Sequence, residues 1–511
     1  MVRMTLADVV LDGLARAGTS RIFCAAGEGL DPPLLRSARR HGLGVVPARD
    51  LAAACVMASV TGDLNRSPGA ALTRLGPGLA TAGLARARLD GSPMILLTDG
   101  RPDEPPASRR SRPADARLFL GAVVKASIAV GPGSAADAIV RACRLALGEP
   151  PGPVHLDLGA DAAEEPAVPV ATALRPDGLP PPDRGALDRA ARILAAATRP
   201  LLVAGGQCRT GEVAGWLRAL AEALPAPVLV TPKAKGVLPD PHPLHLGLFL
   251  GKAIGAAPLA RADLVVAIGL DPSELADGDW LGSGAAPPVL RLARSPDDRY
   301  RPLAEVVGEI GLAIEELAPR LQGRDRADWD VAELDRAKRA IGAERPMPTG
   351  GLGAARVVQI ARELAPPGTI VSVDAGEVRG VVTATWPALA PGEYLVSNDA
   401  RTPGFAVPAA IAARLAHPDR CVLGFAGEAG LPLAVADLET AARLGLSLAV
   451  IVLRGEGAPG VPVRDLPARP ESVSIFTADG EAGLGGALRR ALDARGPTLV
   501  EARVARYPQS R

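Results

Sequence analysis

The chain has 511 residues, of which 48% are apolar and only 3% aromatic, so its length allows several domains with aliphatic cores. The formal net charge is +1, and acidic and basic residues are mixed along the chain, which excludes the basic stripe of a nucleic-acid-binding protein. The sequence contains no run of about 18 apolar residues, the length that a membrane-spanning helix requires.

The cysteines and the first residues indicate the compartment. The five cysteines are scattered and none forms a C-x-x-C pair, a pattern typical of a reducing environment. Residues 1–18 have the apolar periodicity of an amphipathic helix and lack the long apolar stretch of a signal peptide. We therefore expect a cytoplasmic protein.

Helices and strands are expected to alternate through the first third of the chain. Apolar periodicity predicts helices at 5–17, 30–41, 51–63, 80–89 and 135–147. Short apolar runs predict strands at 21–25, 44–46, 69–73, 94–98 and 153–158. This alternation indicates a parallel, doubly wound sheet.

A second αβ block lies between two linkers. Residues 161–185 are rich in Ala, Pro and acids, a composition that predicts a stiff linker. The block that follows has predicted helices at 187–197 and 212–223, and predicted strands at 200–204, 228–230, 264–268 and 288–292. The polar segment 323–345 is predicted to be a helical connector.

The third block has predicted helices at 354–364, 408–415 and 481–494, and strands at 369–373, 472–476 and 498–502. Within it, residues 423–460 predict a strand, a Gly turn, a helix, a strand and a loop. That helix is expected to place Leu431, Val435, Leu438 and Ala442 on one face and to end at Gly445. The expected fold is α/β, with three doubly wound parallel-sheet domains at 1–160, 186–322 and 351–511 and linkers at 161–185 and 323–350.

Several segments occur in an order that is specific for one enzyme family. They are IFCAAGEG (22–29), the long stretch from ARDLAAAC to LLTDG (48–100), TPKAKGVLPDPHPLHLG (231–247), ADLVVAIG (262–269), VSVDAG (371–376) and TPGFAVPAAIAARL (402–415). In these segments the chain resembles the thiamine diphosphate (ThDP) enzymes of the acetolactate synthase, benzoylformate decarboxylase and oxalyl-CoA decarboxylase group. The resemblance implies a pyrimidine-type domain, a central domain and a diphosphate-type domain, with ThDP and Mg²⁺ as cofactors.

In that family a Gly-Asp-Gly turn and a later Asn pair hold Mg²⁺ and the diphosphate. The turn matches Gly427-Glu428-Ala429, and the pair, after 24 intervening residues, matches Arg454-Gly455. The resemblance makes Glu428 a candidate metal ligand, since a hard cation takes carboxylate oxygens. Gly455 stands at the second metal position without a side chain, and Arg454 could contact the diphosphate. The alternative is that 427–455 serves only for packing.

The candidate catalytic residue is Asp50. The resemblance places it where the family has a Glu that hydrogen-bonds to the aminopyrimidine ring of the cofactor. Asp50 keeps the carboxylate but is shorter by one methylene, and a displacement of about 1 Å in a catalytic group can cost roughly a hundredfold in rate. The alternative is that Asp50 is only the N-cap of the helix 51–63.

Other cofactor contacts are implied by position alone. Pro403, before Gly404, occupies the place of a large aliphatic residue that lies under the cofactor. Gly376 and Arg379 lie where some relatives hold the diphosphate. The loop Gly76-Pro77-Gly78 is expected near the cofactor, although such a sequence also suits a plain αβ turn.

FAD, which acetolactate synthases bind in the central domain, is not expected in this chain. The central block has no G-x-G-x-x-G fingerprint, and Gly205-Gly206 is only a weak nucleotide-loop signal.

Three hypotheses on function follow. The first is a ThDP- and Mg²⁺-dependent lyase or carboligase that acts on a small-molecule substrate, a 2-oxo acid. The second is an enzyme of this fold that has changed or lost its cofactor. The third is a non-catalytic paralogue that pairs with an active one. Active sites of this family form between the pyrimidine domain of one subunit and the diphosphate domain of another, which implies a homodimer or homotetramer.

Overall fold

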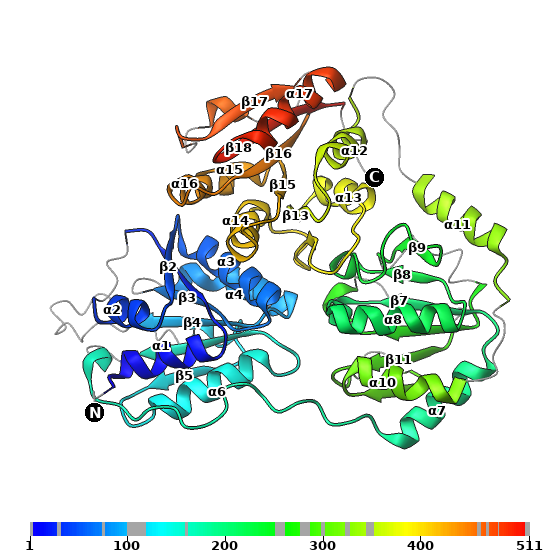
Figure 1. Ribbon diagram of the computed structural model, residues 1–511, viewed down its shortest axis with the longest axis horizontal. Helices are drawn as coiled ribbons and strands as arrows, with labels where there is room; N and C mark the ends of the chain where they lie inside the picture. The colour runs from blue at the N-terminus through cyan, green and yellow to red at the C-terminus, as the bar shows by residue number, and fades with distance from the viewer. Residues whose placement is uncertain are drawn as a thin grey trace.

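Each third of the chain folds around its own parallel sheet of six strands, with helices on both faces (Figure 1). The computed structural model describes residues 4–27, 32–73, 77–99, 119–158, 162–250, 261–275, 287–297, 302–321, 328–343, 352–456, 461–466, 470–478 and 480–505. The predicted α/β class with three doubly wound sheets is confirmed. Within the described ranges, every helix is too short or too polar to cross a bilayer.

The N-terminal sheet has the strand order β2-β1-β3-β4-β6-β5. Its strands are β1 (Arg21–Ala25), β2 (Gly44–Ala48), β3 (Gly69–Thr73), β4 (Met94–Asp99), β5 (Ser127–Val130) and β6 (Pro153–Leu158). Its helices are α1 (Leu6–Arg16), α2 (Pro32–Arg40), α3 (Leu51–Asn65), η1 (Pro77–Ala80), α4 (Thr81–Asp90), α6 (Ala135–Leu147) and η2 (Ala162–Glu164). Successive side chains point to opposite faces: Ile22 and Cys24 contact the core under α1, α2 and α6, whereas Phe23 joins the core under α3 and α4.

The central sheet has the order β12-β11-β10-β7-β8-β9. Its strands are β7 (Pro200–Ala204), β8 (Val228–Val230), β9 (His245–Leu248), β10 (Leu264–Ile268), β11 (Val289–Ala293) and β12 (Ala304–Val307). Its helices are α7 (Arg184–Ala196), η3 (Gly206–Cys208), α8 (Gly211–Ala223), η4 (Pro232–Ala234), η5 (Pro272–Glu274), α10 (Ile310–Leu317) and η6 (Ala318–Leu321), and α11 (Val331–Ala343) follows. The interior strand β10 is buried along its whole length, as a strand covered on both faces should be.

The C-terminal sheet has the order β14-β13-β15-β16-β18-β17. Its strands are β13 (Ile370–Val373), β14 (Tyr394–Leu395), β15 (Val422–Gly427), β16 (Leu448–Gly455), β17 (Ser474–Ala478) and β18 (Pro497–Val504). Its helices are α12 (Ala354–Leu364), α13 (Glu377–Thr385), α14 (Ala406–Ala416), α15 (Leu431–Ala434), η7 (Val435–Asp437), α16 (Leu438–Arg443), η8 (Val463–Asp465) and α17 (Gly480–Asp493).

One hydrophobic core joins the N-terminal and C-terminal domains. Buried side chains of α3 and α4 belong to the same cluster as those of α14, α15 and α16. In Figure 1, α14 lies beside α3, and the central domain forms the third corner of a triangle. The two terminal domains are therefore packed face to face through helices, which places their loops near one another.

The helix predicted after the Gly turn is not continuous, and this prediction was wrong. α15 ends at Ala434, the 3-10 turn η7 follows, and α16 completes the segment. Thr440, within α16, donates a hydrogen bond to the carbonyl of Pro47, so the segment after the interruption contacts the N-terminal domain. The predicted end of the segment is confirmed, because Gly445 has a φ of +64°.

Candidate active site

The C-terminal sheet has a crossover point at its centre. β14 lies on one side of β13 and β15 on the other, so the loops after β13 and β15 diverge at the carboxyl edge of the sheet. Ligands of doubly wound sheets bind outside the strands at such a point. Gly376 follows β13 and Glu428 follows β15, so the structure brings these two predicted loops to the same crossover point, which we call the crevice.

Asp374 ties the loops of this crevice together. Its Oδ1 accepts hydrogen bonds from the backbone N–H groups of Ala375, Gly404 and Phe405 at 2.9, 2.8 and 3.0 Å. Burial raises the pKa of Asp374, although these three bonds oppose the shift. At Gly430 an added Cβ would stand 1.7 Å from Asp374 Oδ2, so only glycine allows this close approach.

The predicted metal positions face each other across the crevice. The N–H of Gly455 donates to Glu428 Oε1 at 2.8 Å, so the two loops meet as the resemblance implies. However, a hard cation needs about six oxygen ligands, and of the two matched metal positions Glu428 has a carboxylate whereas Gly455 has no side chain. Among the described residues no group of three or more His, Cys, Asp and Glu side chains could hold a metal ion. The side chains present do not fit a Mg²⁺ site with two side-chain ligands.

Both arginines that the sequence predicts as phosphate contacts bind protein groups. Arg454 Nη1 lies 3.0 Å from Oε1 of Glu501 on β18, whose side chain is 2% exposed. Arg379 Nη1 donates to the carbonyl of Ser397 at 2.7 Å, and burial lowers the pKa of Arg379. A diphosphate in this crevice would therefore share these cations with existing partners.

Two glycines give the crevice its backbone shape. Gly376, with a φ of +88°, begins α13, whose first N–H groups can receive an anion. Gly404, with a φ of +94°, follows the half-buried Pro403, and its Cβ position lies 3.6 Å from the Cβ of Leu433. Ala429 is exposed beside them, in the turn after β15.

Asp50 is the N-cap of α3, because its Oδ1 accepts a hydrogen bond from the N–H of Ala53 at 2.9 Å. Its Oδ2 lies 3.7 Å from Arg49 Nη1, and the side chain is 45% exposed. The same Arg49 Nη1 donates to the carbonyl of Leu433 at 2.8 Å. Arg49 and Asp50 form the corner between β2 and α3, and this corner thus lies against the segment that follows the Glu428 turn. Leu433 of that segment also lies against the Gly404 loop.

The Gly-Pro-Gly loop is described only in part. Gly76 lies outside the described residues, whereas Pro77 and Gly78 begin η1 and lead into α4. Gly78 is exposed, and its Cβ position is 3.4 Å from the ring of Phe119.

Arg86 of α4 reaches the crevice, and the sequence reasoning missed it. Its side chain is 4% exposed, Nη2 donates to the carbonyl of Thr402 at 2.9 Å, and the guanidinium lies 5.5 Å from the centre of the Phe405 ring. Burial lowers the pKa of Arg86. The available signal was an arginine between apolar residues, ahead of Arg88 and Asp90 at the end of the same helix.

The central sheet has its own crossover point, between β7 and β10. There the N–H of Gly206, which could receive a nucleotide phosphate, donates to both oxygens of Glu274 at 2.9 Å. Thr231 Oγ1 donates to the same carboxylate. The backbone N–H of Gly206, which the weak nucleotide-loop signal would offer to a phosphate, is therefore already bound to a side chain of the protein. This favours the prediction that FAD is not bound.

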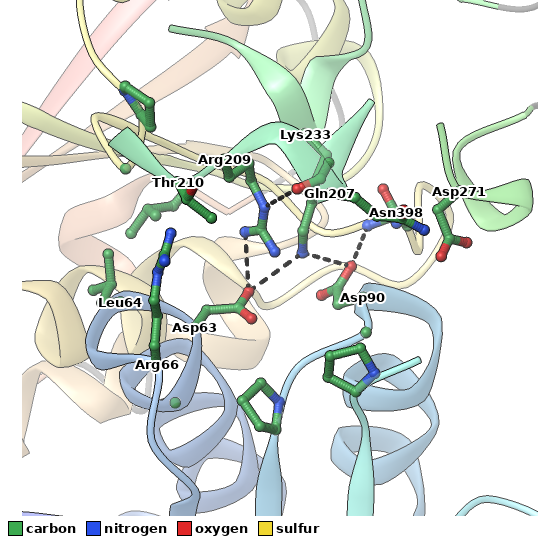
Figure 2. A pocket seen from close by; sticks show the side chains of 18 of the residues that line it. Asp63, Leu64, Arg66, Asp90, Gln207, Arg209, Thr210, Lys233, Asp271 and Asn398 are labelled. Atoms are coloured by element: carbon green, nitrogen blue, oxygen red, sulfur yellow. Dashed lines mark hydrogen bonds and ion pairs between the residues drawn. The ribbon is translucent and has the colours of Figure 1, made fainter. Parts of the chain in front are cut away.

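A cavity of about 350 Å³ lies where the three domains meet (Figure 2). Lys233 Nζ stands in it between two carboxylates, 3.6 Å from Asp63 Oδ2 and 3.1 Å from Asp90 Oδ1. Arg209 Nη1 lies 3.2 Å from Asp63 Oδ2, and the N–H of Asn398 donates to Asp90 Oδ1. We call Asp63, Asp90, Arg209 and Lys233 the charge clasp. It links the N-terminal domain to the central domain, and the hydrogen bond from Asn398 to Asp90 connects the C-terminal domain to it.

Comparison with known proteins agrees with this architecture. Sequence models of the thiamine pyrophosphate enzymes match residues 4–106 (N-terminal TPP binding domain), 187–317 (central domain) and 374–458 (C-terminal TPP binding domain). The chain is 25% identical to the catabolic acetolactate synthase of Raoultella terrigena, over 97% of this chain and 94% of that protein. It is 29% identical to the probable 2-ketoarginine decarboxylase AruI of Pseudomonas aeruginosa, over 98% of this chain and 94% of that protein.

A solved structure shows the same fold. The X-ray structure of a protein from Mycobacterium smegmatis, which is proposed to be a thiamin diphosphate-dependent enzyme, superimposes with a TM-score of 0.80. The alignment covers 98% of this chain and 100% of that one at 22% identity, so the likeness concerns the fold alone.

Proposed function

Because the chain belongs to the thiamine pyrophosphate enzymes, with all three of their domains in order, we propose that it is a ThDP-dependent lyase or carboligase acting on a 2-oxo acid. The observation that carries the proposal is the position of Asp50, at the corner of the N-terminal domain that contacts Leu433 in the C-terminal domain. Two relatives are named for making acetolactate and for decarboxylating 2-ketoarginine, which supports a 2-oxo acid as the substrate class.

The cofactor and the residues of the site have different roles in the proposed reaction. When bound, ThDP supplies the electron sink for making or breaking a bond next to a carbonyl carbon. Asp50 Oδ2 is the oxygen that is not engaged in capping α3, so it is the atom that can take up or return a proton. Asp374 holds the surrounding loops in place, and no step is assigned to a metal ion, since the side-chain ligands do not fit one.

Assembly into a homodimer or homotetramer is part of this proposal. Large apolar side chains are exposed on both terminal domains: Leu79 and Phe119 at and beside Gly78, and Leu433 beside Gly404. A second copy of the chain would cover them.

A second candidate function is a family member without ThDP chemistry, either an enzyme with other chemistry or a non-catalytic paralogue of an active subunit. The hydrogen bond between Gly455 and Glu428 favours it, together with the ion pair of Arg454 and Glu501. In both cases a position that would serve the cation or the diphosphate already has a partner within the protein.

The test is CO₂ release from a panel of 2-oxo acids, pyruvate and 2-ketoarginine included, with ThDP and Mg²⁺ present. Asp50→Asn keeps an N-cap acceptor but cannot take up a proton, so we expect turnover to fall by at least about a hundredfold. Asp183→Asn is the matched control, because Asp183 caps α7 in the central domain in the same way. Turnover of Asp50→Asn equal to that of the control would refute the assignment.

A further inference from the structure

The loop between β14 and α14 carries Pro403 and Gly404 into the crevice, and we call residues 396–405 the crevice loop. It contains no helix or strand. Side chains hold its backbone instead: Asp374 accepts hydrogen bonds from two of its N–H groups, and Asp399 accepts from two others. The shape of the crevice loop therefore depends on a few side-chain contacts, and the loss of one of them can move it.

Helix α4 of the N-terminal domain contacts the crevice loop at two points. Near the start of the loop, the N–H of Asn398 donates to Asp90 Oδ1, and Asn398 Nδ2 donates to the carbonyl of Leu89 at 3.1 Å. Near its end, Arg86 Nη2 donates to the carbonyl of Thr402 at 2.9 Å. Arg86 and Asp90 lie about one helical turn apart, so one face of α4 makes both contacts. The crevice loop is thereby held in place by the N-terminal domain.

The burial of Arg86 is unfavourable for stability. The residue is 4% exposed, and its Nε and Nη1 have no hydrogen-bond partner among the described residues. It retains the bond to Thr402, the contact with the Phe405 ring at 5.5 Å and the attraction of nearby carboxylates. Buried donors without partners cost free energy, and an apolar side chain of similar volume often replaces a buried charge without loss of stability. Stability alone thus does not explain an arginine at this position.

The two residues that Arg86 contacts flank Pro403 and Gly404 in the sequence. A guanidinium is planar and holds its contacts in a fixed orientation, unlike the freely rotating ammonium group of lysine. We infer that Arg86 is a positioning residue: by holding the carbonyl of Thr402 and the ring of Phe405, it fixes the backbone of Pro403 and Gly404 in the crevice. That this backbone supports ThDP rests on the proposed function; the ordering of the crevice loop by Arg86 does not.

Hydrogen–deuterium exchange of the full chain, read by mass spectrometry, tests the ordering without turnover. Arg86→Met removes the guanidinium and keeps an unbranched apolar side chain, so exchange of the amides in residues 398–405 should rise by about tenfold, while Tm stays the same or increases. Arg88→Met, at an exposed position on the same helix, is the matched control and should exchange like the wild type. Unchanged exchange of the crevice loop in Arg86→Met, or faster exchange over the whole chain with a lower Tm, would overturn the inference.

The role in the proposed reaction is tested by steady-state kinetics on the panel of 2-oxo acids, with ThDP and Mg²⁺ present. In Arg86→Met, kcat should fall by about tenfold with little change in KM, because a displaced loop disturbs the reacting groups more than substrate binding. In Arg86→Ala, added guanidinium should restore part of kcat, whereas added ammonium should not. Turnover of Arg86→Met equal to that of Arg88→Met, or equal rescue by both cations, would reject the positioning role. Absence of turnover in every protein, with faster exchange confined to the crevice loop of Arg86→Met, would instead reject the proposed function and keep the ordering by Arg86.

Discussion

Single residues of the crevice combine a structural and a candidate chemical role. Asp50 caps α3 and faces the C-terminal domain, and Glu428 accepts a bond from Gly455. The sequence predicted these positions because they belong to ordered motifs. It could not predict that Arg454 pairs with Glu501, since the two residues lie far apart in the chain and meet only through the pairing of β16 with β18.

The buried side chain of His245 should make the thermal stability of the chain depend on pH. Burial lowers the pKa of His245 to about 4, below the usual value of about 6.5 in an unfolded chain. Above pH 6.5 His245 is neutral in both the folded and the unfolded state, so it does not make the free energy of unfolding depend on pH. As the pH falls toward 4, the unfolded state binds a proton at His245 that the folded state does not bind, so the free energy of unfolding decreases. In thermal denaturation, His245→Gln should gain Tm relative to the wild type as the pH is lowered over this range. A difference in Tm that is constant with pH would contradict the shift.

At the scale of elements, position within the sheet decides what could be predicted from sequence. The interior strands were all expected, since strands covered on both faces need continuous apolar runs. The strands β5, β9, β12 and β14 were not expected, and each is at the edge of its sheet. Edge strands are short and partly exposed, as in the alternating burial of β12, so their apolar signal is weak.

The interruption of the helix after Glu428 could not be predicted from the sequence pattern either. Leu431, Val435 and Leu438 are buried as predicted, so the periodicity was informative about burial. The 3-10 turn instead accompanies contacts with the N-terminal domain, which local periodicity does not contain.

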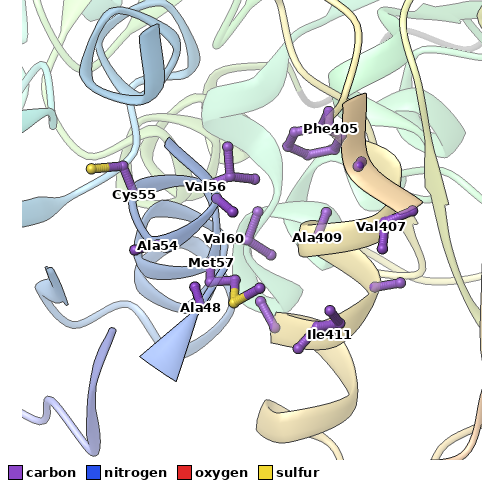
Figure 3. Close-up of a cluster of buried hydrophobic side chains, with 14 of the residues drawn as sticks. Ala48, Ala54, Cys55, Val56, Met57, Val60, Phe405, Val407, Ala409 and Ile411 are labelled. Atoms are coloured by element: carbon purple, nitrogen blue, oxygen red, sulfur yellow. The ribbon is translucent and has the colours of Figure 1, made fainter. Parts of the chain in front are cut away.

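The packing of α3 on α14 should contribute to the free energy of unfolding of the chain. Figure 3 shows Met57 and Val60 of α3 facing Ala409 and Ile411 of α14. Met57 is fully buried, so Met57→Ala should lower the free energy of unfolding by about 2–5 kcal/mol through the cavity that it leaves. Chemical denaturation measures this loss. Leu64→Ala, at a half-buried position near the end of α3, is the control, and an equal loss in both variants would contradict a tightly packed interface.

At the scale of the whole molecule, two different contacts join the three domains. The hydrophobic core under α3 and α14 holds the terminal domains together, and the charge clasp holds the central domain to them. The clasp lies at the cavity in Figure 2, at the carboxyl edge of the central sheet. The order of motifs predicted the domains, but it contained no information about the charges between them.

Removal of Lys233 should destabilise the assembly of domains. Its side chain is 6% exposed, and Lys233→Met would leave Asp90 without its cation, which for a buried pair costs about 3–5 kcal/mol. Calorimetry should show a lower Tm or a separate transition. Arg218→Ala breaks a half-exposed pair with Glu222 and should cost less than about 1 kcal/mol. If both variants lose the same amount, the charge clasp contributes little.

Isothermal titration of the full chain with ThDP in saturating Mg²⁺ measures whether the chain binds the cofactor that the proposed function requires. We expect saturable binding of one ThDP per chain with a Kd above about 10 μM, because Glu428 is the side-chain ligand that remains. Binding tighter than this would still support the proposed function and would exclude the cofactor-free alternative. No binding up to about 1 mM ThDP would contradict the assignment of a ThDP-dependent enzyme.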